Sequence, residues 1–479
     1  MRATTPSTAA ERRAAPRATG ALAALSGALL GALAGVPLGA GTAHAQDTAA
    51  PRLAFEKYAL PNGLEVILHE DRSVPLVAVN TWYKVGSGDE QPGRTGFAHL
   101  FEHVMFMGSQ NVPVGAFDQW LEAAGADING STWFDRTNYY ETMPSNALPL
   151  ALWLDADRMG FLLPTMDQAK LDLQRDVVKN ERRERVENVP YGRAEETILP
   201  VLFPKGHPYS WFVIGSMADL SAASLDDVKR FFRTYYAPNN ATIAIAGDFD
   251  RDSAKAWVER YFGDIPRGPQ AVTRPTVPPV ALPRDTFLVL EDAVQLPRVY
   301  YTWHSAKAFA PDDAVLDVLA YVLAGDKNSR LYKSLVYDKQ VAQEVNAFQF
   351  SGRVDGFFRV DVTPKPGQAP QRIAELAAAE IQRVIDGAVT ERELARAKNT
   401  IRTNLLDRLA NVLGKADQLN FYNYIAGDPD YLRQDLERYD RVTAADVQRV
   451  ARTYLGAPKV VLTVVPTGET KLMVSGRVE

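Results

Sequence analysis

The chain has 479 residues, of which 46% are hydrophobic and 23% charged, and its formal net charge is −5. This length is enough for two or three domains with sizeable cores, and the mildly acidic composition gives no support for nucleic-acid binding. The absence of cysteine excludes disulfides, thiolate metal sites and cysteine nucleophiles.

The first 45 residues are typical of a secretory signal peptide. An arginine-containing start is followed by an Ala/Leu/Gly run from about Gly20 to Gly41 and by Ala43-His44-Ala45, a small-x-small cleavage pattern. We therefore predict cleavage after Ala45 and a periplasmic or secreted protein. An uncleaved anchor is the alternative, which Pro37 and the glycines in the run disfavour. No later apolar run is long enough to span a membrane.

The first half of the remaining chain predicts an α+β fold, with a meandering, mainly antiparallel sheet and helices. Pro61-Asn62-Gly63 is a hairpin signal between the first two strands. Strands are predicted at Phe55–Leu60, Leu64–His69, Val77–Val85, Ala126–Thr132 and Asn138–Met143, and helices at Gly96–Met107, Val114–Ala124, Ala147–Phe161 and Asp167–Glu187.

The segment His99-Leu100-Phe101-Glu102-His103 is the strongest functional signal in the chain. On a helix, histidines four residues apart project from one face and can hold one divalent ion, with Glu102 beside it. The order H-x-x-E-H is the inverse of the H-E-x-x-H found in other zinc hydrolases. A catalytic zinc needs a third protein ligand, and the helix predicted at Asp167–Glu187 offers four carboxylates. These are Asp176, Glu181, Glu184 and Glu187.

The second half of the chain repeats the first. Six prolines between Pro266 and Pro283 mark a linker. Asp227-Val228 recurs as Asp446-Val447, and Arg233-Thr234-Tyr235 recurs as Arg452-Thr453-Tyr454, both 219 residues later. Each set lies on a predicted amphipathic helix that leads into a β-branched strand, which indicates a duplicated domain. We predict domains at residues 50–266 and 285–479, joined by a linker at 267–284.

Residues Gly96 to Ser109 resemble the zinc helix of the inverzincin peptidases of family M16, which include pitrilysin, insulin-degrading enzyme and the mitochondrial processing peptidase. The segment from Gln174 to Glu181 resembles the second zinc segment of that family, whose last glutamate is a ligand. The resemblance implies one Zn²⁺ per chain, bound by His99, His103 and Glu181, with Glu102 as the catalytic base. Asn129-Gly130-Ser131-Thr132 resembles the edge strand on which the family binds its substrate, so Asn129 and Gly130 become candidate substrate-binding residues.

One feature of the family is missing from the second half. Long, single-chain members supply an arginine and a tyrosine that hold the substrate, and the matching positions here are Val336 and Gln343. The chain is also about half the length of those members. It is similar to the zinc subunit of the two-subunit members and to short bacterial ones, which implies a heterodimer with a homologous subunit lacking H-x-x-E-H, or a homodimer. The 285–479 domain is then inactive.

The resemblance implies a zinc metalloendopeptidase that cleaves peptides or unfolded segments in an enclosed chamber. Two alternatives stay open. One is a non-catalytic core or scaffold subunit of the same fold, and the other is a maturation protease dedicated to one secreted peptide.

Overall fold

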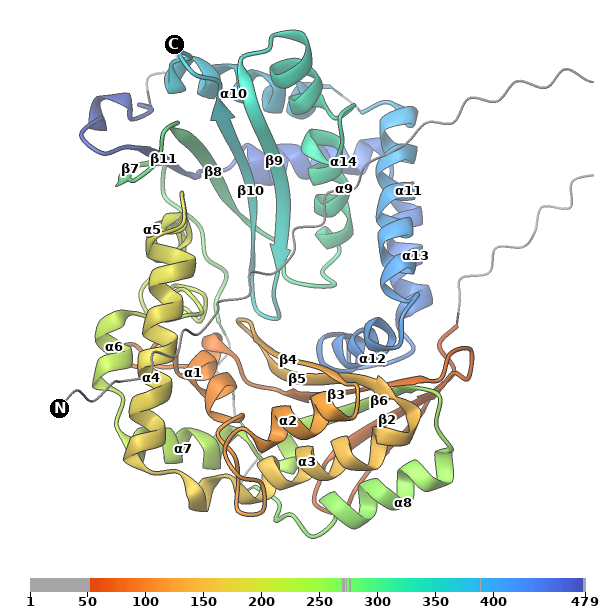
Figure 1. The fold of residues 1–479 in the computed structure, drawn as a ribbon. Coiled ribbons are helices and arrows are strands. Elements are labelled where there is room, and N and C mark those ends of the chain that lie inside the picture. The colour runs from red at the N-terminus through yellow and green to blue at the C-terminus, as the bar shows by residue number, and fades with distance from the viewer. Residues whose placement is uncertain (1–51, 269–271, 273, 275–276, 388, 477–479) are drawn as a thin grey trace, which may run out of the picture. The chain divides into compact units, whose positions relative to one another are not determined.

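The computed structural model describes residues 52–479, except for 269–271, 273, 275–276, 388 and 477–479. The predicted signal peptide and its cleavage site lie outside these residues. The described chain forms two sheets covered by helices, which confirms the α+β prediction (Figure 1). Among the described residues, no helix has the length and apolar character needed to cross a membrane.

The first sheet has the strand order β1-β2-β6-β3-β5-β4. Its strands are β1 (Glu56–Ala59), β2 (Glu65–Glu70), β3 (Leu76–Tyr83), β4 (Asp127–Thr132), β5 (Thr137–Pro144) and β6 (Ala241–Gly247). All neighbours are antiparallel except β2 and β6. The prediction of a simple meander was wrong, because β6 returns from much later in the chain and inserts between β2 and β3. The predicted β1–β2 hairpin is confirmed, and the strands predicted at Ala126–Thr132 and Asn138–Met143 pair as a second hairpin, β4–β5.

The helices of the first half are α1 (Phe97–Val104), α2 (Ala116–Ala123), α3 (Leu148–Phe161), α4 (Gln168–Arg182), α5 (Ala194–Leu202), α6 (Met217–Ala222), α7 (Leu225–Tyr235) and α8 (Arg251–Phe262). A single apolar cluster joins one face of the sheet to α1, α3, α7 and α8. A short π-helical turn, Arg183–Glu187, follows α4 directly. Helix α1 packs on β4 and β5 of the sheet, and α4 packs against α1.

The second sheet has the order β7-β11-β8-β10-β9. Its strands are β7 (Thr286–Asp292), β8 (Arg298–Ser305), β9 (Ala342–Ser351), β10 (Gly356–Pro364) and β11 (Val460–Pro466). The helices of this half are α9 (Asp313–Ala324), α10 (Pro370–Asp386), α11 (Glu391–Arg408), α12 (Val412–Phe421), α13 (Leu432–Arg441) and α14 (Ala444–Val450). Only β7 and β11 pair in parallel among the described strands of this sheet.

The two halves are homologous domains, as the 219-residue repeat predicted. Shifting β6 by 219 residues gives the bounds of β11, and the same shift places α7 on α14 and the turn after it. The β4–β5 pair Thr132–Thr137 becomes the β9–β10 pair Ser351–Gly356. The strand order of the two sheets then matches from β2 and β7 onward, so the duplication extends over the whole fold.

One helix of each domain packs against the sheet of the other domain. Helix α12 of the second domain packs on β3 and β6, whereas α5 of the first domain packs on β11 and β8. These two helices are equivalents under the same 219-residue shift. Polar contacts reinforce the exchange, since Arg359 on β10 binds Glu195 on α5 at 2.7 Å and Asn80 on β3 binds Asp417 on α12 at 3.1 Å. The exchange joins the two domains through both sheets.

Candidate metal centre

Helix α1 is fixed in orientation by its first turn. Gly96 precedes it with φ of +85°, a conformation that glycine adopts without strain. The buried carboxylate of Glu90 accepts hydrogen bonds from the backbone N–H groups of Gly96 at 2.9 Å and Ala98 at 2.7 Å. These two bonds satisfy N–H groups that the helix start leaves open. The apolar face of α1 lies in the core through Leu100, Phe101 and Val104.

The structure brings His99, His103 and Glu181 together. Glu181 lies near the end of α4, which packs against α1. Its Oε2 is 3.0 Å from His103 Nε2 and 3.6 Å from His99 Nε2, and the three potential ligand atoms lie within 4.8 Å of one another. Ligand atoms around a tetrahedral ion with bonds of about 2.1 Å are about 3.4 Å apart. The observed spacings bracket that value.

The chemistry of this trio also suits a divalent ion. Two imidazole nitrogens and one carboxylate oxygen form a ligand set that zinc accepts. Burial, with a further contribution from His103, lowers the pKa of His99 to about 4, so its imidazole is neutral as a metal ligand must be. The contact with His103 lowers the pKa of Glu181, which keeps it ionised, and Arg185 binds its other oxygen at 2.8 Å. The residues present therefore fit a zinc ion.

Glu102 lies on α1, like the two histidines, and its side chain is contacted by strand β4 of the sheet. Thr132, the last residue of β4, donates a hydrogen bond from Oγ1 to Glu102 Oε2 at 2.5 Å. A methyl group on Gly130 would lie 3.0 Å from Glu102 Cγ, so the strand backbone packs directly against this side chain. Burial raises the pKa of Glu102 and outweighs the opposing effect of Thr132. A carboxylate with a raised pKa is suited to accept and release a proton near neutral pH.

Asn129 and Gly130 lie on β4, which is a terminal strand of its sheet. The side-chain Oδ1 of Asn129 accepts a hydrogen bond from the backbone N–H of Gly130 at 2.8 Å. That N–H is thus covered by a side chain and not by a neighbouring strand. An exposed strand edge is the usual docking place for an extended peptide.

The other carboxylates considered as third ligands lie outside the trio. Asp176 and Glu184 are exposed, and Glu187 forms an ion pair with Arg182 at 3.2 Å. The remaining described histidines lie in other environments. His69 contacts the backbone carbonyl of Ala54, while His207 stacks on Phe203 and His304 meets the same ring edge-on.

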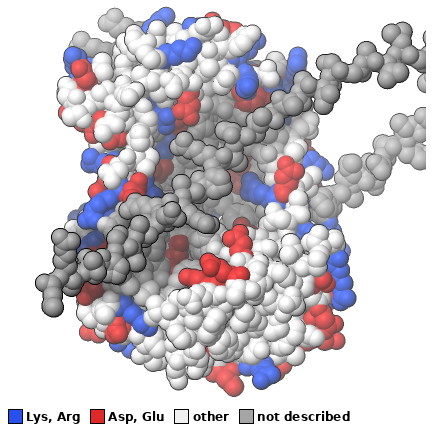
Figure 2. Space-filling model, in the orientation of Figure 1, with Lys and Arg blue, Asp and Glu red and all other residues white. Residues whose placement is uncertain are grey.

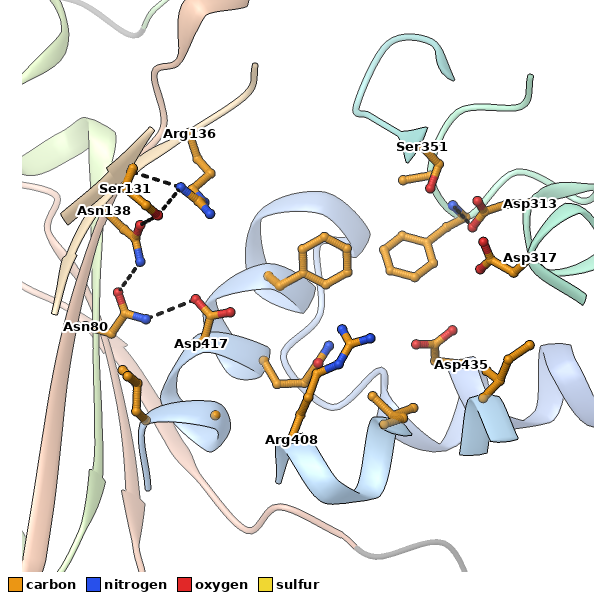
Figure 3. A pocket seen from close by; sticks show the side chains of 18 of the residues that line it. Asn80, Ser131, Arg136, Asn138, Asp313, Asp317, Ser351, Arg408, Asp417 and Asp435 are labelled. Carbon is orange, nitrogen blue, oxygen red and sulfur yellow. Dashed lines mark hydrogen bonds between the residues drawn. The ribbon is translucent and has the colours of Figure 1, made fainter. Parts of the chain in front are cut away.

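A cavity of about 580 Å³ is lined on one side by Ser131, Arg136 and Asn138 of the β4–β5 hairpin (Figure 3). One wall is a hydrogen-bonded chain that runs from Arg136 through Ser131, Asn138 and Asn80 of the first domain to Asp417 on α12 of the second. The opposite wall comes from α9, α11 and α13. None of the three potential ligands lines this cavity, so it is separate from the candidate metal centre.

The face of the protein drawn in Figure 2 carries acidic and basic side chains interspersed, without one large area of a single sign. Val336 lies in a π-helical turn, and Gln343 is exposed on β9.

Known proteins share both halves of this architecture. The profile "Insulinase (Peptidase family M16)" matches residues 65–200, and the profile "Peptidase M16 inactive domain" matches residues 222–401. Together they cover well over half of the chain. The chain belongs to peptidase family M16.

Relatives within family M16 extend over most of the chain. The zinc protease PqqE of Helicobacter pylori is 29% identical over 410 residues, which are 83% of this chain and 90% of that protein. The probable mitochondrial-processing peptidase subunit beta of Arabidopsis thaliana is 23% identical over 83% of this chain and 75% of its own. The crystal structure of a protease from Helicobacter pylori superposes with a TM-score of 0.80 at 26% identity, covering 87% of this chain and all of that one.

Two residues of the site were not singled out from the sequence. Thr132 enters the sequence prediction only as part of the edge-strand motif, and Glu90 does not enter it. Two sequence signals could have found them. Thr132 is a hydroxyl residue at the end of a predicted edge strand, and Glu90 is an acidic residue shortly before a predicted helix. Neither signal predicts which residue is contacted, because the contacts of Thr132 and Glu90 depend on how β4 and the loop before α1 pack on that helix.

Proposed function

We propose that this chain is a zinc metalloendopeptidase that cleaves peptides or unfolded polypeptide segments, with His99, His103 and Glu181 as the ligands of one Zn²⁺. The observation that carries the proposal is the convergence of these three side chains beside Glu102. Zinc in such a site acts as a Lewis acid and lowers the pKa of water toward neutrality. The alternatives for the third ligand are exposed or paired elsewhere.

Glu102 is the proposed general base. Its Oε2 is engaged by Thr132, which leaves Oε1 to take a proton from the attacking water. Because burial raises the pKa of Glu102, the protonated carboxyl can then donate that proton to the leaving amine. The three ligands thus hold the metal ion, and Glu102 transfers the proton from the water to the leaving amine.

The substrate is proposed to lie in extended form along β4, with Asn129 and Gly130 at the contact. A peptide that adds to a strand edge binds through its backbone, so selectivity for sequence is low. Low sequence selectivity suits the cleavage of unfolded segments. The family resemblance implies that these segments are enclosed in a chamber during cleavage.

We further propose that the chain acts as the zinc-carrying half of a dimer in the periplasm or outside the cell. The signal-peptide pattern supports the location. Val336 and Gln343, in place of the family's arginine and tyrosine, support a homologous partner that supplies this pair. A homodimer is the alternative, and full peptidase activity of the purified chain as a monomer or homodimer would exclude the heterodimer.

The decisive experiment is Glu102→Gln, with the exposed Glu122→Gln on the neighbouring α2 as the control of equal charge change. Zinc content is measured by elemental analysis and cleavage with an unstructured fluorogenic peptide, in the presence of the partner subunit if one is required. We expect Glu102→Gln to retain zinc and lose about 10²–10⁴-fold in kcat, while the control keeps both.

The outcomes also separate the alternatives. A wild-type chain that binds zinc but cleaves nothing, alone or with its partner, would favour a non-catalytic scaffold subunit. Cleavage restricted to a single sequence in a diverse peptide library would favour a dedicated maturation protease.

A further inference from the structure

The hydroxyl of Thr132 donates a hydrogen bond to Glu102 Oε2 at 2.5 Å, and within the described residues no other side chain donates to this carboxylate. Glu102 itself is largely buried between α1 and β4, and Gly130 on the same strand lies against its Cγ. The direction in which this carboxylate points is therefore determined by the strand and not by α1 alone. A glutamate side chain without such contacts would populate several rotamers.

The register of the hairpin shows where the backbone of Thr132 points. Trp133 donates its N–H to Arg136 O at 2.8 Å, so this pair is hydrogen-bonded and the next pair, Thr132–Thr137, is not. In antiparallel pairing, residues of non-hydrogen-bonded pairs direct their N–H and C=O groups away from the partner strand. For β4 that direction is the open edge of the sheet. Gly130 has the same orientation, and the side chain that caps its N–H is consistent with it.

Thr132 thus has two connections at once. Its side chain reaches from one face of the sheet to Glu102, whereas its backbone groups face the edge where a peptide strand would bind. We propose that Thr132 is a positioning residue that orients the carboxylate of Glu102. Through its backbone groups, Thr132 also links this orientation to the binding of an extended peptide along β4. This inference rests on the proposed function, and it extends that function by making the edge strand part of the machinery that places the base.

The test compares Thr132→Val, which removes the hydroxyl and keeps the shape, with Thr132→Ser, which restores the hydroxyl. Thr142→Val on β5 is the matched control, because it is the same substitution on the neighbouring strand at a half-buried site. Steady-state kinetics on an unstructured peptide give kcat and KM. Zinc content and binding of the same peptide to the metal-free protein, measured by fluorescence anisotropy, provide readouts that do not depend on turnover.

We expect Thr132→Val to lower kcat about tenfold to a hundredfold, the effect of losing one hydrogen bond to a charged group. KM, zinc content and peptide affinity should stay within about twofold of wild type, Thr132→Ser should recover most of kcat, and Thr142→Val should be unchanged. A wild-type kcat in Thr132→Val, or no recovery in Thr132→Ser, would overturn the inference and leave the proposed function intact. A wild-type protein that binds zinc and cleaves nothing would overturn both.

Discussion

The two domains share one fold, but within the described residues the cluster of potential metal ligands lies in the first. With the 219-residue shift that relates the domains, His99, Glu102 and His103 of α1 correspond to Val318, Tyr321 and Val322 of α9, and Glu181 corresponds to Thr400. The side chains of His99 and His103 are 12% and 22% exposed, whereas Val318 and Val322 are completely or almost completely buried. The same helix position therefore serves as core in one domain and as a polar site in the other.

This difference shows that the same fold can close its core without the potential metal ligands. The second domain closes its core with aliphatic side chains where the first places imidazoles. In the first domain, His99 Nδ1 is buried without a hydrogen-bond partner among the described residues. Burying such a group costs free energy, so the candidate site is a local departure from the most stable arrangement of the fold.

The largest expected effect concerns the third ligand. Glu181→Gln should weaken zinc binding about a thousandfold or more, beyond the roughly 10–100-fold that loss of an outer-shell partner costs. Glu184→Gln, an exposed carboxylate three residues later, is the control and should bind zinc as wild type does. Competition with a zinc chelator measures both. Equal weakening in the two variants would contradict the assignment of Glu181.

A converse change tests the second domain. Val322→His places an imidazole in the fully closed core of α9, where the position equivalent to Glu181 is a threonine. We expect a loss of about 2–3 kcal/mol in the free energy of unfolding and no second zinc per chain. Denaturant titration and elemental analysis check the two parts, and a gain of zinc would refute the contrast between the domains.

Acid should weaken a contact that joins the two domains. Glu65 on β2 accepts a hydrogen bond from Asn423, which follows α12. Burial raises the pKa of Glu65, but Lys84 and Lys57 lower it more, to about 2. Its folded-state pKa is below the unfolded value, so it contributes stability above about pH 4.5 that is lost as the pH falls toward 2.

Glu65→Gln should consequently destabilise the protein by about 1–2 kcal/mol at pH 7, an amount reduced for the partial exposure of the carboxylate. The difference from wild type should shrink as the pH falls from 4.5 toward 2. Denaturant titrations of the metal-free proteins at several pH values measure it. A difference that grows on acidification would contradict the sign of this linkage.

The smallest expected effect comes from giving α1 the residues of α9. The double variant His99→Val, His103→Val should bind no zinc at the trio, yet its metal-free form should be more stable than wild type by about 1 kcal/mol. Adding zinc should raise the melting temperature of wild type and leave the variant unchanged. A metal-free variant clearly less stable than wild type would show that the imidazoles support the fold.

Local patterns in the sequence determined much of this protein. Hydrophobic periodicity and turn residues place most of the elements, and the histidine spacing puts both imidazoles on one face of a helix because a helical turn is 3.6 residues long. The 219-residue repeat predicts the duplication from a few residues. Each of these signals is contained within a short segment or repeats at a constant offset.

The tertiary structure decided what depends on contacts between distant segments. Glu181 lies 78 residues beyond His103, and spacing alone leaves it among four carboxylates until α4 packs on α1. The insertion of β6 into the first sheet and the exchange of α5 and α12 follow from pairing and burial over more than a hundred residues. Thr132 reaches Glu102 only because β4 ends beside α1, and no local pattern encodes that distance.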